Sequence, residues 1–327
     1  MSYFKKIISF VLCFTFIFTL AACSGKTADT DNTDEKLSII CTVFPEYDWV
    51  KNILGDNAEN IDLTLLLDSG VDLHNYQPTV DDMVKIAQCD MFVYVGGESD
   101  KWVDDALKNA KEKLIKINLL EVLGDKAKEE EEVEGMQAEE EDEHEHEKEY
   151  DEHVWLSLKN AQIFVRAISE KLQSLDNDSK EQYEKNTAAY LEKLSGLDSE
   201  FEAVCNASDR KTLLFGDRFP FRYMTDDYGL SYYAAFSGCS AETEASFETV
   251  SFLAQKVDEL GLKTVLTIEG SDGSIARTII NNTKTQDQTV LSLNSMQGIT
   301  EKDVQNGVSY LSVMEDNLIT LEKALEE

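Results

Sequence analysis

The sequence has few basic residues, no paired cysteine motif and no recognisable catalytic signature. Lysine and arginine total 30 against 64 aspartates and glutamates, so the formal net charge is −34. A phosphate backbone requires a basic surface, so nucleic acid is not an expected partner. No CxxC pair is present, which argues against a zinc knuckle built from thiolates. The GxSxG, HExxH, P-loop and GxGxxG patterns are missing too, so neither a familiar hydrolase nor a nucleotide-binding protein is indicated.

The N-terminal residues are typical of an export signal. A short basic stretch is followed by the apolar run 7–20 and then by "LAAC", which ends at Cys23. This pattern resembles a bacterial lipoprotein signal, which predicts a signal peptide at 1–22 and a lipid on Cys23. A transmembrane anchor is the alternative, but the apolar run is short for a span. The polar residues 23–36 are expected to form a flexible tether. The export signal predicts that the mature protein lies outside the cytoplasm.

The remainder of the chain alternates short apolar runs with amphipathic stretches. This alternation predicts an α/β fold of two lobes, each a mostly parallel sheet with flanking helices, joined by one long rigid helix. The expected N-terminal lobe covers 37–177, the linking helix 178–207 and the C-terminal lobe 208–327. The strands are expected within eight runs: 36–45, 60–70, 89–97, 112–119, 211–216, 230–237, 263–270 and 288–294.

The segment 124–150 interrupts this pattern. Glutamate dominates it and no aromatic residue occurs before Tyr150, so we expect a mobile acidic insertion that has no means of packing. Two of the four histidines in the chain, His144 and His146, lie within it.

The cysteines of the exported chain give a weak signal. Cys41 and Cys89 lie in apolar, strand-like runs and are expected to be buried. The sequence leaves open whether Cys205 and Cys239 form a disulfide bridge in an oxidising compartment.

His74 and His153 are the other two histidines. His74 follows an expected strand in "DSGVDLHNYQPTVDD", and His153 precedes an expected helix in "YDEHVWLSLKNA". Ligands bind α/β sheets at loops beyond the carboxyl ends of parallel strands, and imidazole is a common zinc ligand. Taken alone, a loop histidine is more often an ordinary surface or capping residue than a metal ligand.

The order of these motifs adds a resemblance to a known family. The lipoprotein signal, "HNYQPTVDD", "GGESDKWVDDAL", the acidic histidine-bearing insertion and "DEHVWLSLKNA" follow one another along the chain. Together they resemble the zinc/manganese solute-binding lipoproteins of ABC transporters, the cluster A-I group. The resemblance implies that His74 and His153 are metal ligands.

The C-terminal half departs from the family pattern. The family's third ligand should lie within "FGDRFPFRYMTDDYGL", which contains neither histidine nor glutamate. Asp217 is the acidic residue near the expected place, although Arg218, which cannot bind a metal, aligns as well. For the fourth ligand, Asn294 aligns but is a poor donor, and Glu269 ends another strand. The expected ligands are therefore Asp217 and Glu269, with Asp272 in reserve. Ion pairs or loop caps are equally open roles for these carboxylates.

The resemblance implies a receptor that captures Zn²⁺ and delivers it to an ABC permease and its ATPase, with Mn²⁺ less favoured. It also implies a lipid-anchored, non-enzymatic monomer on the extracytoplasmic face of a bacterial membrane. His144 and His146 would then form a weak accessory collector of cations. A manganese receptor, a metal-dependent surface adhesin and a zinc hydrolase remain as alternatives.

Overall fold

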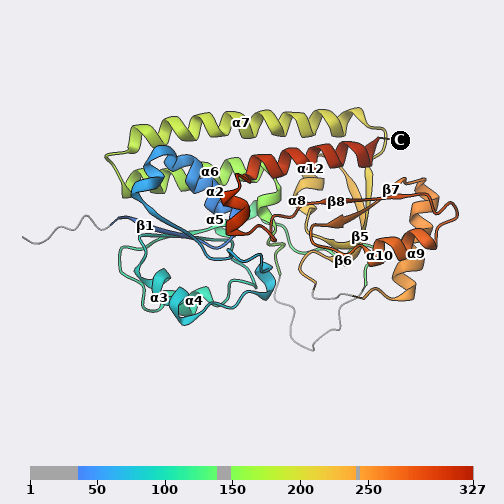
Figure 1. The fold of residues 1–327 in the computed structure, drawn as a ribbon, viewed down its shortest axis with the longest axis horizontal. Helices are drawn as coiled ribbons and strands as arrows, with labels where there is room; N and C mark the ends of the chain where they lie inside the picture. Colours follow the sequence, from blue (N-terminus) through green and yellow to red (C-terminus); the bar gives the residue numbers. More distant parts are fainter. Residues whose placement is uncertain (1–35, 138–148, 241–243, 327) are drawn as a thin grey trace, which may run out of the picture. The chain divides into compact units, whose positions relative to one another are not determined.

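The computed structural model describes residues 36–137, 149–240 and 244–326, and Leu37–Glu327 form one compact unit (Figure 1). Its strands form two four-stranded sheets, in the orders β2-β1-β3-β4 and β6-β5-β7-β8, and every pairing is parallel. The predicted α/β fold with two sheets is therefore confirmed. The strands are β1 (Ser38–Cys41), β2 (Asp62–Leu65), β3 (Met91–Tyr94), β4 (Ile115–Asn118), β5 (Thr212–Phe219), β6 (Ser231–Ser237), β7 (Thr264–Ile268) and β8 (Thr289–Leu293).

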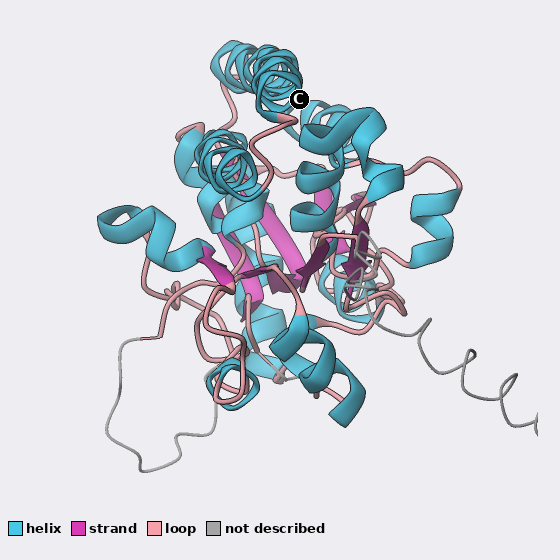
Figure 2. Ribbon diagram, turned by 90° about the vertical axis from the view of Figure 1, so that its left-hand side faces the viewer, coloured by secondary structure: helices cyan, strands magenta, loops and turns pink. Residues whose placement is uncertain are grey.

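Helices cover both faces of the strands (Figure 2). This explains why the central strands are continuous apolar runs, as in β1, where Ile39, Ile40 and Cys41 are at most 1% exposed. In the described ranges, no helix is long and apolar enough to cross a bilayer. The helices are α2 (Phe44–Leu54), α3 (Val80–Gln88), α4 (Val103–Leu107), α5 (Leu119–Leu123), α6 (Leu158–Leu175), α7 (Lys180–Ala207), α8 (Arg222–Asp227), α9 (Phe247–Leu260), α10 (Ser274–Asn281), α11 (Glu301–Gln305) and α12 (Tyr310–Leu325).

Helix α7 runs beside elements of both lobes (Figure 1). Its residues, Lys180–Ala207, nearly coincide with the range 178–207 expected for the linking helix. Its 28 residues extend about 42 Å at the usual helical rise. On the N-terminal side, the hydroxyl of Tyr190 donates to Asp48 at 3.2 Å. On the C-terminal side, the Phe201 ring stacks on Tyr228, with 5.2 Å between ring centroids. One stiff element thus contacts both lobes.

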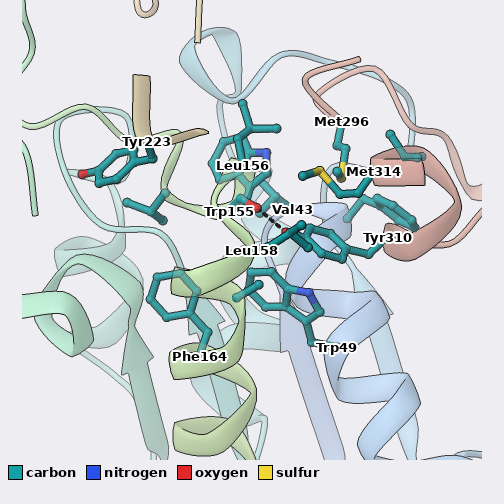
Figure 3. Close-up of a cluster of buried hydrophobic side chains, with 14 of the residues drawn as sticks. Val43, Trp49, Trp155, Leu156, Leu158, Phe164, Tyr223, Met296, Tyr310 and Met314 are labelled. Atoms are coloured by element: carbon teal, nitrogen blue, oxygen red, sulfur yellow. Dashed lines mark hydrogen bonds between the residues drawn. The ribbon is translucent and has the colours of Figure 1, made fainter. Parts of the chain in front are cut away.

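A buried aromatic cluster lies where the two lobes meet (Figure 3). Trp49 of α2 stacks on Phe164 of α6 and meets the ring of Tyr310 of α12 edge-on, at centroid distances of 5.5 and 5.3 Å. The Tyr310 hydroxyl donates to the backbone oxygen of Trp155 at 2.7 Å. The Trp155 indole N–H donates to the backbone oxygen of Ser295, after β8, at 2.8 Å. The lobes therefore share one apolar core here.

The acidic segment departs from the expectation of a mobile insertion without packing. Its described ends pair with each other, because Glu129 and Tyr150 form an antiparallel bridge. Beyond this bridge, the Gln137 N–H donates to the backbone oxygen of Ala235 in β6 at 2.9 Å. Residues 128–137, called the docked arm below, therefore cross to the C-terminal lobe. Hydrogen bonds and ion pairs hold the arm, and Met136 adds an apolar contact with the core, so the arm packs although its composition is mostly acidic. His144 and His146 lie outside the described residues.

Glu46 is a buried carboxyl group at the first turn of α2. Its Oε2 accepts hydrogen bonds from the backbone and hydroxyl of Thr42 and from the Val43 N–H, at 2.9, 3.0 and 3.3 Å. Its Oε1 has no hydrogen-bond partner among the described residues. Burial, together with the negative charge of Asp100, raises the pKa of Glu46 from 4.5 to about 8, although these hydrogen bonds oppose the shift.

This raised pKa predicts a fall in stability as pH increases. Between pH 4.5 and 8 the unfolded chain releases the Glu46 proton and the folded chain keeps it, so ionisation favours unfolding. Over this interval, Glu46→Gln should gain stability relative to the wild type by up to about 1.4 kcal/mol per pH unit. Urea unfolding with a chelator present at pH 5, 6, 7 and 8 measures the difference. Glu112→Gln, on the surface, is the matched control, and parallel curves for wild type and Glu46→Gln would refute the assignment.

Candidate metal centre

His74 lies in the loop after β2, within the 3₁₀ turn Leu73–Asn75. The Asp72 side chain starts this turn by accepting the His74 N–H at 3.0 Å. The His74 ring is 13% exposed, and its Nδ1 lies 2.8 Å from the Ser99 hydroxyl and 3.5 Å from Glu152 Oε2. These partners occupy Nδ1 and leave Nε2 for a ligand.

His153 lies in the loop just before the 3₁₀ turn Val154–Leu156 and is completely buried. Asp151 Oδ1 accepts from both the backbone N–H and the ring Nδ1 of His153, at 2.9 and 3.0 Å. Because a carboxylate can only accept, Nδ1 carries a hydrogen, and coordination is left to Nε2. Gly238 gives this ring its space, since a Cβ there would lie 3.1 Å from His153 Cε1 and 2.9 Å from the Phe219 oxygen.

The two imidazoles face each other through their Nε2 atoms, which lie opposite the Nδ1 atoms that Asp151 and Ser99 contact. Their Nε2 atoms are 3.2 Å apart. Burial lowers the pKa of His74 to about 4, and the neighbouring His153 adds to the shift. Burial also opposes charge on His153, but the hydrogen bond and negative charge of Asp151, with Glu130 and Glu152, outweigh it and raise the pKa of His153. The pair thus suits one shared proton or one cation.

Cys239 is the third side chain at this point, and the sequence did not predict its place beside the histidines. One donor atom from each of His74, His153 and Cys239 lies within 4.8 Å of the other two. Cys239 and Cys205 are both free thiols, so the bridge that the sequence left open is not formed. Burial raises the pKa of the Cys239 thiol well above its usual range, with the charges of Glu130, Asp151 and Glu152 adding to the shift.

A signal for Cys239 was present in the sequence. The residue follows β6 just as His74 follows β2, at the carboxyl end of a parallel strand, where such sheets place ligands. In the sequence, a lone cysteine at such a position is equally compatible with a disulfide, so the position alone does not identify a ligand.

The expected carboxylates line the same cavity, which has a volume of about 990 Å³, together with His74 and Cys239. Among the described side chains, however, neither Asp217 nor Glu269 belongs to the donor group around the histidines. Asp217 Oδ1 accepts the Arg218 N–H at 2.9 Å. Glu269 accepts the backbone and hydroxyl of Ser295 at 2.7 and 2.6 Å. Asp217 thus bonds to its own strand, β5, and Glu269 holds the loop after β8.

Asp272, the reserve candidate, and Asn294, which aligned with the fourth family ligand, have local partners as well. Asp272 Oδ1 accepts the Ser274 N–H at 2.7 Å, next to the start of α10. Asn294 also lines the cavity, and its Oδ1 accepts the Met296 N–H at 2.7 Å. These contacts match the capping roles that the sequence left open for such residues.

Arg218, which aligned as well as Asp217 did, connects the lobes beside the histidines. Its Nη2 donates to Asp72 Oδ2 at 2.9 Å, and the two side chains are 22% and 17% exposed. Asp72 thus starts the turn of His74 with one oxygen and binds the C-terminal lobe with the other.

Comparison with known proteins identifies the family. The family model described as "ZnuA: Zinc-uptake complex component A periplasmic" matches residues 39–324, and the chain belongs to this family. It is 32% identical over 327 residues to the zinc-binding lipoprotein AdcA of Streptococcus pneumoniae, covering 98% of this chain and 62% of that protein. It is 30% identical over 319 residues to the high-affinity zinc uptake system protein ZnuA of Bacillus subtilis, covering 97% of this chain and 96% of that protein.

Solved structures show the same fold. The Zn(II)-bound ZnuA-like domain of Streptococcus pneumoniae AdcA matches with a TM-score of 0.70 at 30% identity, covering 89% of this chain and 100% of that one. The metal-dependent lipoprotein YcdH of Bacillus subtilis matches with a TM-score of 0.71 at 27% identity, covering 89% of this chain and 99% of that one.

The ion pair between Asp72 and Arg218 predicts measurable coupling between the lobes. Arg218→Met and Asp72→Asn should each lower the free energy of unfolding by about 1–2 kcal/mol, because each leaves a half-buried charge unpaired. The double variant should lose less than the sum, by about 1 kcal/mol. Urea unfolding in the presence of a chelator measures all four proteins.

The matched control is Lys85→Met, since Lys85 pairs with Asp81 on the surface. Its effect should stay within about 0.5 kcal/mol. Strict additivity of Arg218→Met and Asp72→Asn would show that the contact between the lobes contributes no stability.

Proposed function

We propose that this protein is an extracytoplasmic Zn²⁺ receptor that delivers its cation to an ABC importer. Membership of the zinc-uptake family and the zinc-binding relatives support this function. The observation that carries it is the 3.2 Å separation between the Nε2 atoms of His74 and His153. Two imidazole nitrogens bound to one tetrahedral Zn²⁺ lie roughly 3.3 Å apart, so the pair already has the spacing of zinc ligands.

The residues around the pair would orient it for binding. Asp151 holds the His153 ring by Nδ1, and Ser99 and Glu152 do the same for His74. Such partners of metal-bound histidines fix the ring orientation and increase the basicity of the ligating nitrogen. Zn²⁺ would enter through the cavity, which His74 lines, and would replace the proton between the two rings.

Asp217 and Glu269 would act at longer range. Both line the cavity, and their contacts hold Arg218 and Ser295 rather than a donor position beside the histidines. Their carboxylates would attract a cation toward the histidine pair without binding it directly.

The role is binding and transport rather than catalysis. The family is one of zinc-uptake components. A cation surrounded by protein donors has no open position at which to activate water, so we infer that the chain is not an enzyme. Imidazole ligands favour Zn²⁺, whereas Mn²⁺ sites are richer in carboxylate, so the manganese alternative is not favoured.

The location and partners are those expected for such a receptor. We infer a lipid anchor on Cys23, an ABC permease with its ATPase as the partner, and a monomeric receptor. Cys23 lies outside the described residues, and its support is the apolar run followed by "LAAC". AdcA, a relative of the chain, is named a zinc-binding lipoprotein.

Zinc affinity tests the proposed function directly. The soluble protein without its first 22 residues, freed of metal, should bind one Zn²⁺ with a submicromolar dissociation constant in a competition titration. His74→Ala should weaken binding more than about 100-fold, and Asp151→Asn about 10–100-fold through its effect on His153. Asn75→Ala is the matched control, since Asn75 lines the same cavity from the same turn. A wild-type protein without tight zinc binding would refute the function.

The acidic segment would be an accessory collector of cations. His144 and His146 lie among carboxylates, which raise the local cation concentration and impose little geometry. Replacing 138–148 with a short Gly/Ser linker should leave the tight site unchanged and remove weaker binding. Equilibrium dialysis at excess zinc measures both. The double variant His144→Ala/His146→Ala, which keeps the carboxylates, separates the two residue types, and loss of tight binding on replacement would contradict this role.

A further inference from the structure

We propose that Cys239 is the third zinc ligand, so that the C-terminal lobe contributes a sulfur rather than a carboxylate. This inference rests on the proposed zinc-binding function and specifies its site. His74 and His153 both precede α7 in the chain, so they belong to the N-terminal lobe. Among the described side chains grouped around them, Cys239 comes from the other lobe. A cation held by all three would connect the lobes.

The backbone of the Cys239 loop is held against the histidines from two sides. Gly238 packs so closely that a Cβ on it would lie 3.2 Å from His153 Nδ1. On the other side, Glu130 of the docked arm accepts the Cys239 N–H at 3.0 Å. Because these contacts fix positions 238 and 239, the thiol stays beside the ring nitrogens without a disulfide.

Gln297 gives independent support for a cation bound beside His153. Its side-chain nitrogen lies 3.4 Å from His153 Nε2, and the residue is 9% exposed. Its Oε1 is buried and has no hydrogen-bond partner in the described part of the chain. A buried amide oxygen without a partner is costly. Rotating the amide by half a turn would point this oxygen at the space beside His153 Nε2, where a bound cation would satisfy it. Gln297 thus suits the fourth coordination position.

The donor set predicts which cations bind. Two imidazoles and a thiolate are borderline to soft ligands and suit Zn²⁺, whereas Mn²⁺ prefers carboxylate and water oxygens. Cys239 is a neutral thiol before binding, since burial raises its pKa. As the zinc–sulfur bond forms, the thiol releases its proton to solvent, so binding through sulfur releases one proton more than binding through histidine alone.

Absorption spectroscopy of the Co²⁺-loaded soluble protein tests for the sulfur ligand. Co²⁺ replaces Zn²⁺ in tetrahedral sites, and a bound thiolate adds a near-ultraviolet charge-transfer band that nitrogen and oxygen ligands do not give. The wild type should show this band. Cys239→Ser should lose it, keep the visible bands of bound Co²⁺ and bind Zn²⁺ at least about tenfold more weakly. The ratio of Zn²⁺ to Mn²⁺ affinity should fall in the same variant.

The matched control is Cys205→Ser, which removes a buried free thiol on α7 and should keep the band. A wild-type spectrum that lacks the band decides against the sulfur ligand even where a variant folds poorly. Tight zinc binding without a charge-transfer band in the wild type would overturn the sulfur ligand and leave the receptor function intact. Unchanged zinc affinity in a folded Cys239→Ser protein would overturn it as well. Absence of tight zinc binding in the wild type would refute the receptor function itself.

Discussion

The position of the Trp155 indole between the lobes is the constraint on which the centre depends. The indole N–H donates to the backbone oxygen of Ser295, and the backbone oxygen of Trp155 accepts a hydrogen bond from the Tyr310 hydroxyl. His153 lies two residues earlier, so the contacts that fix the indole also fix the imidazole, and the two rings meet edge-on at 5.4 Å. Glu269 holds Ser295 in turn. A carboxylate that the sequence suggested as a ligand thus supports the loop on which Trp155 rests.

Much of the fold could be predicted because its signals are local. Apolar runs bounded by turn residues located the described strands, as with the run 263–270, which contains β7, although β5 continues to Phe219, beyond the expected 211–216. Periodic apolar positions located α7, where Tyr190, Leu194 and Phe201 are buried. The docked arm could not be predicted. Its composition is that of a solvated chain, and its contacts with Ala235 and Cys239 involve backbone groups, which leave no pattern in the sequence.

The centre was predictable only in part. The two histidines were found because each lies next to a regular element in a motif, and the structure brings them together. The C-terminal contribution was harder, because loop residues such as Cys239 and Gln297 have no periodicity and depend on how two sheets meet. Single residues also carry two roles here. Asp72 starts a turn and pairs with Arg218, and neither role follows from the chain alone.

The bridge between Glu129 and Tyr150 has an evolutionary consequence. Because the two strands of chain pair at this point, any excursion between them begins and ends at the same place on the protein. The entropic cost of closing such a loop rises only slowly with its length. Insertions, deletions and changes of composition between residues 138 and 148, past the docked arm, can therefore accumulate at little cost to the fold. The number of histidines in that part of the chain can therefore change without altering the contacts that position His74 and His153.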